Sequence, residues 1–294
     1  MRFKSSSLLI GVAFASCAFL AAQDLGIEPH REAGQSVTGV YEGWFQNPDG
    51  TYSLLAGYYN RNLVQALDIP VGPNNKIEPG NPDRGQPTYF LPGRQWGLFV
   101  ITVPKDFGTQ KLTWTIVANG KSTVIPLSLA ADWEIKPFVD ATDNTPPFLS
   151  FKSFDDGAAM LQGPIPLRTS LNAKVGVLLS LTVWAADDNK TPPGRREPKY
   201  PVTVMWSKFR GPGQVSFSNS KPIVEKTGDK LPGNATFAGK ATTTATFSQP
   251  GDYTLYVVLN DVSGIGGGGF QCCWTNGMVD VTVEGSPSNI VTGE

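Results

Sequence analysis

Residues 242–259 have the sequence TTTATFSQPGDYTLYVVL, and this stretch decides the fold. Two runs rich in β-branched and aromatic residues, which favour strands, flank the turn-forming pair Pro250-Gly251. In the second run every other residue from Tyr253 onward is apolar. This period of two is typical of a strand with one buried face. The stretch therefore predicts two strands separated by a turn, as in a β-sandwich.

The same pattern recurs on both sides of this stretch. Strands are predicted at residues 179–183, 202–206, 215–217, 242–247, 253–259 and 279–283. No segment between them shows a sustained helical period, so the helical content should be small. Residues 151–285 are therefore predicted to form an immunoglobulin-like antiparallel β-sandwich.

Two motifs in this half resemble a PKD-type repeat of bacterial secreted proteins. One is Trp206 with the following SKFRGPGQVSF, and the other is a T-x-x-F-x-x-P-G-x-Y-x-L run that ends at Leu255. The resemblance covers residues 165–285 and implies a seven-stranded sandwich, although Arg210-Gly-Pro-Gly replaces the usual acidic turn. Independently of it, Trp206 is expected in the core and Tyr253 at a tyrosine corner. Such domains are mostly spacers and adhesion modules, so the resemblance concerns fold more than function.

Residues 37–130 resemble no known family but contain short apolar segments separated by turns. They lie at 39–45, 52–59, 64–69, 88–91, 97–103, 111–118 and 123–129. Asn119-Gly120 between the last two is a strong signal for a two-residue hairpin. A second antiparallel sandwich is therefore predicted, joined to the first by a linker at 131–150 that Pro146-Pro147 restrains, with a tail at 286–294. The predicted fold class is all-β.

The first 22 residues are predicted to be a signal peptide. Two basic residues precede the apolar run 8–20, and Ala21-Ala22 provides a small-residue cleavage site, after which residues 23–36 form a polar leader. Alternatively, Cys17 ends a degenerate lipobox, which would make the protein an outer-membrane lipoprotein. The expected location is secreted, periplasmic or extracellular. No later segment reaches the roughly 20 apolar residues of a membrane span.

The residue inventory argues against most enzyme classes. The single histidine, His30, lies in the leader, so neither sandwich can hold a Ser-His-Asp triad, a Cys-His pair or a histidine-ligated zinc. A formal charge of −1 does not favour nucleic acid as a partner. A small hydrolase based on two carboxylates remains an alternative. The chain is therefore predicted not to be an enzyme.

Cys272-Cys273-Trp274 is a local feature that no strand pattern explains. Without Cys17, these are the only cysteines, and export favours their oxidation. Neighbouring Cα atoms about 3.8 Å apart lie below the usual disulfide range, so a bridge must distort the peptide between them. Such a ring would be a structural staple, or a flat contact site formed by Phe270, Cys272, Cys273 and Trp274. An intermolecular disulfide is a third possibility.

Residues 140–148, DATDNTPPF, resemble the calcium-binding linker between cadherin repeats, D-x-N-D-N-x-P-x-F, and depart from it at Thr142. The resemblance implies a structural calcium site with ligands among Asp140, Asp143 and Asn144. Residues 187–189 form a second cluster of hard oxygen donors. Ordinary solvated turns are the favoured interpretation of both segments, because a hard-cation site needs six or more oxygens. No other cofactor is expected.

Aromatic residues supply the last candidates. Trp44, Tyr58 and Tyr59 would form a sugar-stacking platform if they were exposed together, whereas aromatics usually lie in sandwich cores. Trp184, Met205 and Tyr256 fall out of phase with the inward positions and mark an exposed or interdomain apolar patch. The predicted function is a non-catalytic secreted or cell-surface module for adhesion, scaffolding or partner binding, its partner an envelope protein or a polysaccharide. A carbohydrate-binding accessory protein is the alternative.

Overall fold

The computed structural model describes residues 31–191, 199–266 and 271–285, and residues 31–294 form one unit. The described chain is all-β, and its helices are short 3-10 turns such as η1 (Ala131–Trp133). The predicted signal peptide, Cys17 and His30 lie outside the described residues.

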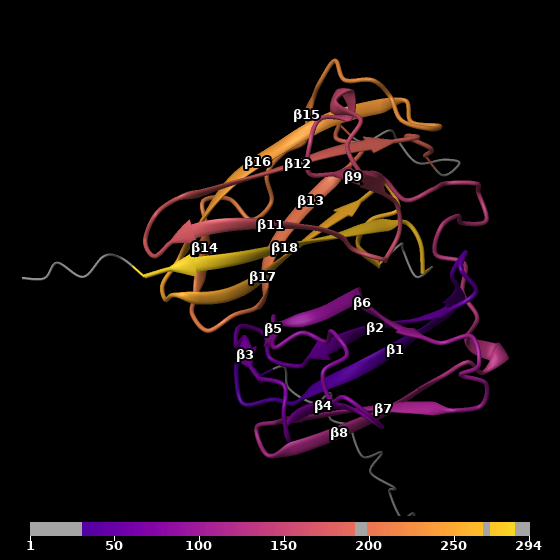
Figure 1. Cartoon of the computed structure of the whole chain (residues 1–294), viewed down its shortest axis with the longest axis vertical. Helices are drawn as coiled ribbons and strands as arrows, with labels where there is room; N and C mark the ends of the chain where they lie inside the picture. Colours follow the sequence, from indigo (N-terminus) through magenta and orange to yellow (C-terminus); the bar gives the residue numbers. More distant parts are fainter. Residues whose placement is uncertain (1–30, 192–198, 267–270, 286–294) are drawn as a thin grey trace, which may run out of the picture. The chain divides into compact units, whose positions relative to one another are not determined.

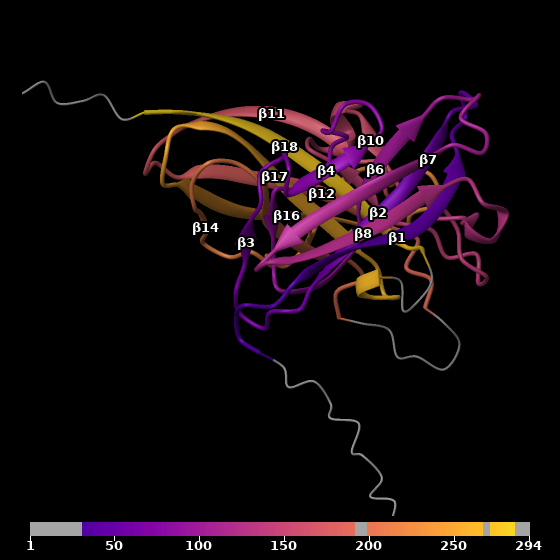
Figure 2. The ribbon, with the colours of Figure 1, turned by 90° about the horizontal axis from the view of Figure 1, so that it is seen from below.

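Residues 37–128 form a first sandwich, coloured indigo to magenta in Figures 1 and 2. Its sheets are β1(Val37–Gln46)-β2(Tyr52–Asn60)-β6(Gly93–Val103), β4(Asn75–Glu78)-β7(Lys111–Ala118)-β8(Lys121–Ser128), and the pair β3(Leu67–Asp68)-β5(Tyr89–Phe90). Ala118 pairs with Lys121, and the two residues between them have positive φ angles, 48° at Asn119 and 74° at Gly120. Because a type I′ turn requires two such residues, the predicted hairpin is confirmed.

Residues 148–284 form the second sandwich. One sheet has the order β10(Met160–Leu161)-β9(Phe148–Ser150)-β12(Leu179–Asp187)-β16(Phe237–Phe247)-β14(Val215–Phe217), and β15(Glu225–Lys226) also pairs with β16. The other sheet has the order β11(Leu167–Lys174)-β18(Trp274–Glu284)-β17(Gly251–Asn260)-β13(Thr203–Arg210). The prediction of purely antiparallel sheets is wrong at one place, because β11 pairs with β18 in parallel. No hairpin joins these two strands, so no turn dictates their direction.

The stretch that decided the fold carries the chain from one sheet to the other. β16 and β17 lie in different sheets, and Pro250-Gly251 lies at the crossing. The Tyr253 hydroxyl donates a hydrogen bond to the Gln249 carbonyl at 2.9 Å and accepts one from the Gly213 amide at 3.0 Å. Trp206 is buried in the core of the same sandwich. Both expectations for this half, the tyrosine corner and the core tryptophan, are confirmed.

The two sandwiches share an apolar core. To a cluster built mainly by the first sandwich, the second adds Phe209, Tyr256, Val258, Trp274 and Met278, with Met205 packed against them. Met205 and Tyr256 thus form the predicted interdomain patch. Trp184, the third residue predicted for this patch, lies on β12, in the sheet of the second sandwich that contains β9 and β16.

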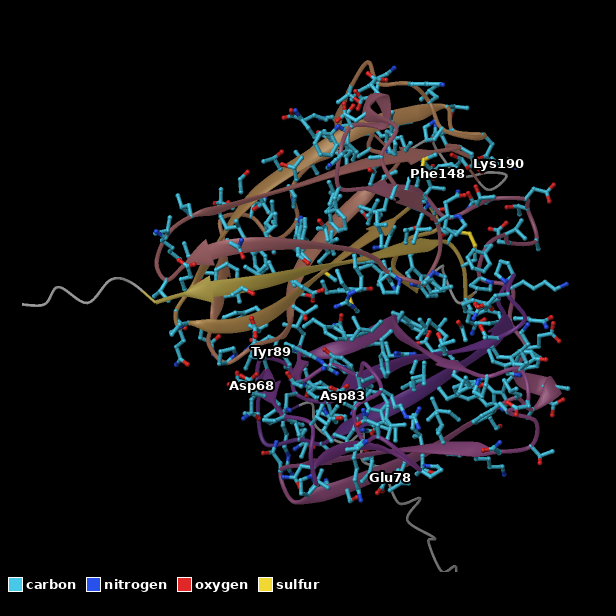
Figure 3. The ribbon with its side chains drawn as sticks, viewed as in Figure 1. Asp68, Glu78, Asp83, Tyr89, Phe148 and Lys190 are labelled. Carbon is cyan, nitrogen blue, oxygen red and sulfur yellow. A yellow bond between two sulfur atoms is a disulfide. The ribbon has the colours of Figure 1, made fainter. Side chains whose placement is uncertain are left out.

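Polar contacts between the two sandwiches lie beside this shared core. Lys208 pairs with Asp68 at 3.0 Å, and Arg210 binds both carboxylate oxygens of Asp83, at 2.8 and 2.9 Å. Figure 3 labels the two aspartates on the first sandwich. The Thr88 amide also donates to the Phe209 carbonyl at 3.2 Å. Strand β13 is therefore fixed to the first sandwich by charge pairs and by its backbone.

Candidate functional site

The two adjacent cysteines are joined by a disulfide, and the peptide bond between them is cis. Cys272 and Cys273 are buried, and Phe270 lies outside the described residues. Trp274 is also buried, because it begins strand β18 and packs on Gly97 of the first sandwich, where an added Cβ would lie 2.1 Å from its ring. The expected flat, accessible surface at these residues is therefore wrong. A binding role for them stays a prediction.

The segment predicted to bind calcium forms a closed turn. One carboxylate oxygen of Asp140 accepts hydrogen bonds from the Thr142 amide and hydroxyl, both at 2.7 Å, and from the Asn144 amide at 3.1 Å. Partial burial by itself would raise the pKa of Asp140, but these hydrogen bonds outweigh it, so the pKa of Asp140 is lowered. The Asp143 carbonyl accepts a hydrogen bond from Lys190 Nζ. Asp140 is thus already bonded to its own turn, and calcium binding there stays a prediction.

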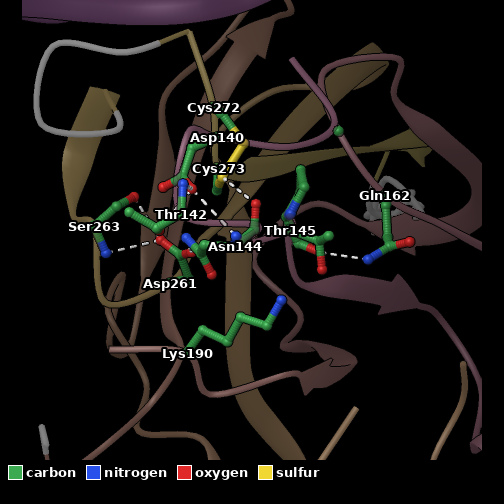
Figure 4. The surroundings of a disulfide bond; sticks show 12 residues. Asp140, Thr142, Asn144, Thr145, Gln162, Lys190, Asp261, Ser263, Cys272 and Cys273 are labelled. Carbon is green, nitrogen blue, oxygen red and sulfur yellow. Dashed lines mark hydrogen bonds between the residues drawn. A yellow bond between two sulfur atoms is a disulfide. The ribbon is translucent and has the colours of Figure 1, made fainter. Parts of the chain in front are cut away.

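Asn144 and Thr145 connect this turn to the second oxygen-rich segment. The Asn144 side-chain amide donates to Asp261 Oδ2 at 2.5 Å (Figure 4). The Thr145 hydroxyl donates to Asp188 Oδ2 at 2.9 Å. Asp261 directly follows β17, and Asp187 is the last residue of β12 in the opposite sheet. These contacts bring three carboxylates to one end of the sandwich. We call Asp187, Asp188 and Asp261 the acidic cluster.

The acidic cluster is buried and has no ion pair with any described residue. Asp187 is 1% exposed and Asp261 is 3% exposed. Burial raises the pKa of Asp187 to about 7. A hydrogen bond from the Asn189 amide acts in the opposite direction, and the neighbouring charges of Asp261 and Asp188 raise the pKa further. Burial also raises the pKa of Asp261. In the described ranges, none of the ion pairs includes a member of the cluster.

Several buried oxygens at this end have no hydrogen-bond partner. They are Asp187 Oδ1, Asn144 Oδ1, Asn189 Oδ1 and Thr191 Oγ1. The vicinal disulfide lies close by, with Cys273 Sγ at 3.4 Å from the Asn144 carbonyl oxygen. Among the residues that the structure describes, no three His, Cys, Asp or Glu side chains form a group that could hold a metal ion. The donors here are instead a mixture of carboxylate, amide and hydroxyl oxygens.

The aromatic platform for carbohydrate is not formed. Tyr58 is buried in the core, where its hydroxyl accepts a hydrogen bond from the Leu91 amide at 2.7 Å. Trp44 is partly buried and donates to the Ala130 carbonyl at 2.8 Å. Because the sugar-stacking hypothesis required Trp44, Tyr58 and Tyr59 to be exposed together, the structure contradicts it.

An apolar groove of about 500 Å³ runs beside β13. Its described lining includes Val202, Val204, Met205, Ile223 and Ile265, with Asp261 as the single acidic residue. Ile223 and Ile265 are both more than half exposed. No sequence pattern indicates this groove, because Ile223 and Ile265 lie in irregular segments outside the strands. Its described lining contains no pair of carboxylates for a hydrolase.

No family model and no curated protein matches the sequence. Among solved structures, the chain is similar to the D00-D0 domain of Intimin, with 12% identity, coverage of 84% of this chain and 100% of that chain, and a TM-score of 0.24. It is also similar to domains 4 and 5 of the S-layer protein SbsC, with 12% identity, coverage of 85% of this chain and 98% of that chain, and a TM-score of 0.21. A third similar structure is the ASH/PapD-like domain of human CEP192, with 8% identity, coverage of 52% of this chain and 94% of that chain, and a TM-score of 0.26. TM-scores this low carry no argument about function. No helix in the described residues is long and apolar enough to cross a membrane.

Proposed function

We propose that this chain is a non-catalytic module outside the cytoplasm that binds an envelope protein through the groove beside β13. The observation that carries the proposal is the pair of exposed isoleucines, Ile223 and Ile265, on a groove with an otherwise largely apolar lining. Exposed apolar surface of this kind is typical of protein interaction sites. The shared core supports a scaffolding role, because it keeps the groove in a fixed position relative to the first sandwich.

Site-specific photocrosslinking in the native cell tests the proposal. A cysteine-reactive crosslinker at Ile223→Cys should capture one defined envelope protein. Val124→Cys on β8 is the matched control, because Val124 is 57% exposed and Ile223 is 54% exposed. Equal capture from both positions, or capture from neither, would count against the groove.

An enzymatic function makes a different prediction. If the protein were a carboxylate-based hydrolase, the secreted protein would release sugars from envelope polysaccharide, and Asp261→Asn would abolish the release. We expect no release from either protein. Release that depends on Asp261 would contradict the proposed function.

A further inference from the structure

Strand β11 is a long sheet edge that no described segment covers. The opposite edge of the same sheet is covered, since the Trp206 amide of β13 donates to the Ser220 carbonyl at 2.8 Å. In β11, by contrast, the backbone of residues 167–173 has hydrogen-bond partners, among the described residues, only in β18. The strand has eight residues and contains neither a proline nor a bulge, two of the devices that protect sheet edges. An edge of this kind is a template for pairing with another chain.

The backbone groups of β11 that point away from β18 follow from the residue just after the strand. The Val175 amide donates to the Glu284 carbonyl of β18 at 3.0 Å. Because successive residues of a strand direct their backbone groups to opposite sides, the odd-numbered residues of β11 face β18. Arg168, Ser170 and Asn172 therefore direct their N–H and C=O groups outward. The side chains of these three residues are exposed, so the first sandwich does not cover this part of the strand.

The sequence of β11 is complementary to itself in the antiparallel direction. A two-fold axis at Ser170 places Ser170 opposite its own copy and Arg168 opposite the Asn172 of a second copy. These are the residues with outward backbone groups, so each facing pair can exchange both N–H···O bonds. On the inner face of the sheet, partly buried residues face one another in the pairs Leu167–Ala173 and Thr169–Leu171. Each residue thus faces a residue of similar exposure, and no like charges lie opposite each other.

The neighbouring registers that also match the two faces are less favourable. A shift by two positions in one direction would place Arg168 opposite Lys174, and like charges at facing positions are destabilising. A shift by two positions in the other direction would place Asn172 opposite Pro166, which has no N–H to donate. The axis at Ser170 avoids both defects.

We propose that β11 pairs antiparallel with β11 of a second copy of this chain, about a two-fold axis at Ser170. The pairing joins two four-stranded sheets into one continuous sheet, and each copy offers the same surface to the other, as a two-fold interface requires. The groove beside β13 lies at the opposite edge of the sheet and is not part of the pairing. The inference therefore does not depend on the proposed function.

Cysteine crosslinking of the exported protein tests the pairing and its register. At position 170 the two copies of the residue face each other, with Cα atoms about 5.5 Å apart. A short bis-maleimide should therefore convert Ser170→Cys into a covalent dimer. Lys174→Cys is the matched control, because Lys174 is exposed on the same strand but lies about 27 Å from its copy in this register, and it should not crosslink.

Light scattering and sedimentation test the role of the backbone. Ser170→Pro removes the outward N–H at the axis and leaves the bonds to β18 in place. It should raise the dissociation constant of the dimer at least about tenfold. Ser170→Ala keeps the backbone groups and should change the constant by less than about threefold.

Three outcomes would overturn the proposal. The first is wild-type protein that stays monomeric up to about 1 mM. The second is crosslinking that fails at Ser170→Cys, that is equal at both positions, or that captures a different protein in the native cell. The third is a dimer that Ser170→Pro leaves unchanged. If Ser170→Pro does not fold, Ser170→Lys replaces it with the same expected weakening, because it places like charges opposite each other while Asp280 lies beside position 170 in the same chain.

Discussion

The contact between the sandwiches and the acidic cluster both contain charged side chains, but the environments of those charges are opposite: the side chains of Asp68 and Asp83 at the contact are 47% and 42% exposed, whereas the cluster is buried. At the contact, each acid has a basic partner, as in Lys208–Asp68 and Arg210–Asp83. In the cluster, three aspartates share one end of a sandwich without an ion pair to any residue that the structure describes. The pKa values reflect this contrast, since hydrogen bonds from Arg210 lower the pKa of Asp83, whereas burial raises the pKa of Asp187 to about 7.

The contrast separates a region where charges are paired from one where they are not. The contact combines apolar packing with two ion pairs, although Trp274 Nε1 in the shared core has no hydrogen-bond partner among the described residues. Within the described ranges, the cluster has no ion pair and several of the oxygens around it have no hydrogen-bond partner, which costs stability. The contact therefore stabilises the arrangement of the two sandwiches, whereas the cluster is an unfavourable concentration of buried acids.

The largest effect is expected from the buried amide that crosses the contact. Asn276 donates to the carbonyls of Gly97 at 2.7 Å and Pro164 at 2.9 Å and accepts from the Tyr256 hydroxyl at 2.6 Å. Asn276→Ala would leave three buried polar groups without a partner, so the free energy of unfolding should fall by about 3–6 kcal/mol. Urea denaturation measures the loss, with exposed Asn172→Ala on β11 as a control expected within about 0.5 kcal/mol. A loss below about 1 kcal/mol would show that water replaces the amide.

The second prediction concerns the cluster. At about pH 8, Asp187→Asn should raise the free energy of unfolding by roughly 1–3 kcal/mol, because it removes a buried charge and keeps an oxygen for the Asn189 amide. Exposed Asp106→Asn should change it by less than about 0.5 kcal/mol. If Asp187→Asn destabilises the protein, the charge of the cluster is already balanced and the contrast between the two regions fails.

Much of the fold could be predicted from the sequence because its signals are local. Alternating apolar residues, the Asn119-Gly120 turn and the Tyr253 corner each depend on neighbours within a few positions. Strand β18 was predicted to begin too late because Asn276-Gly277 is typical of a turn, yet both residues pair with β17. Asn276 is held there by groups of both sandwiches, and no local pattern contains that information.

The site was less predictable because it depends on contacts between distant residues. Asn144 and Asp261, which are hydrogen-bonded, are 117 positions apart in the chain. Two of the three segments, 140–144 and 187–189, stood out as oxygen-rich, but Asp261 did not, since a single aspartate after a strand is ordinary turn composition. The burial of Cys272 and Cys273 was also unpredictable, because a pair of adjacent cysteines does not indicate which surface covers it.

The third prediction returns to the paired charges at the contact. Arg210→Ala should lower the free energy of unfolding by about 1–2 kcal/mol, because it removes a two-pronged, partly buried bond to Asp83. Folding lowers the pKa of the Asp83 carboxyl group. The ion pair therefore stabilises the protein fully above the pKa of the unfolded chain, about 3.9, and this stabilisation is lost as the pH falls through the lower pKa of the folded protein. The difference between wild type and Arg210→Ala should therefore shrink below about pH 4. A difference that is constant down to about pH 2 would show that the arginine acts through packing alone.

The smallest effect is expected at Lys208, whose side chain is 3% exposed while that of its partner Asp68 is 47% exposed. Lys208→Met keeps most of the volume that packs over the Tyr89 ring, and the freed Asp68 carboxylate remains hydrated, so the free energy of unfolding should change by less than about 1 kcal/mol. The reciprocal change, Asp68→Ala, should cost more than Lys208→Met, because it leaves the buried ammonium group without its counter-charge. Denaturation curves of both variants measure this asymmetry. If Lys208→Met costs more than Asp68→Ala, the charge pair itself, and not the apolar packing around it, holds β13 against the first sandwich.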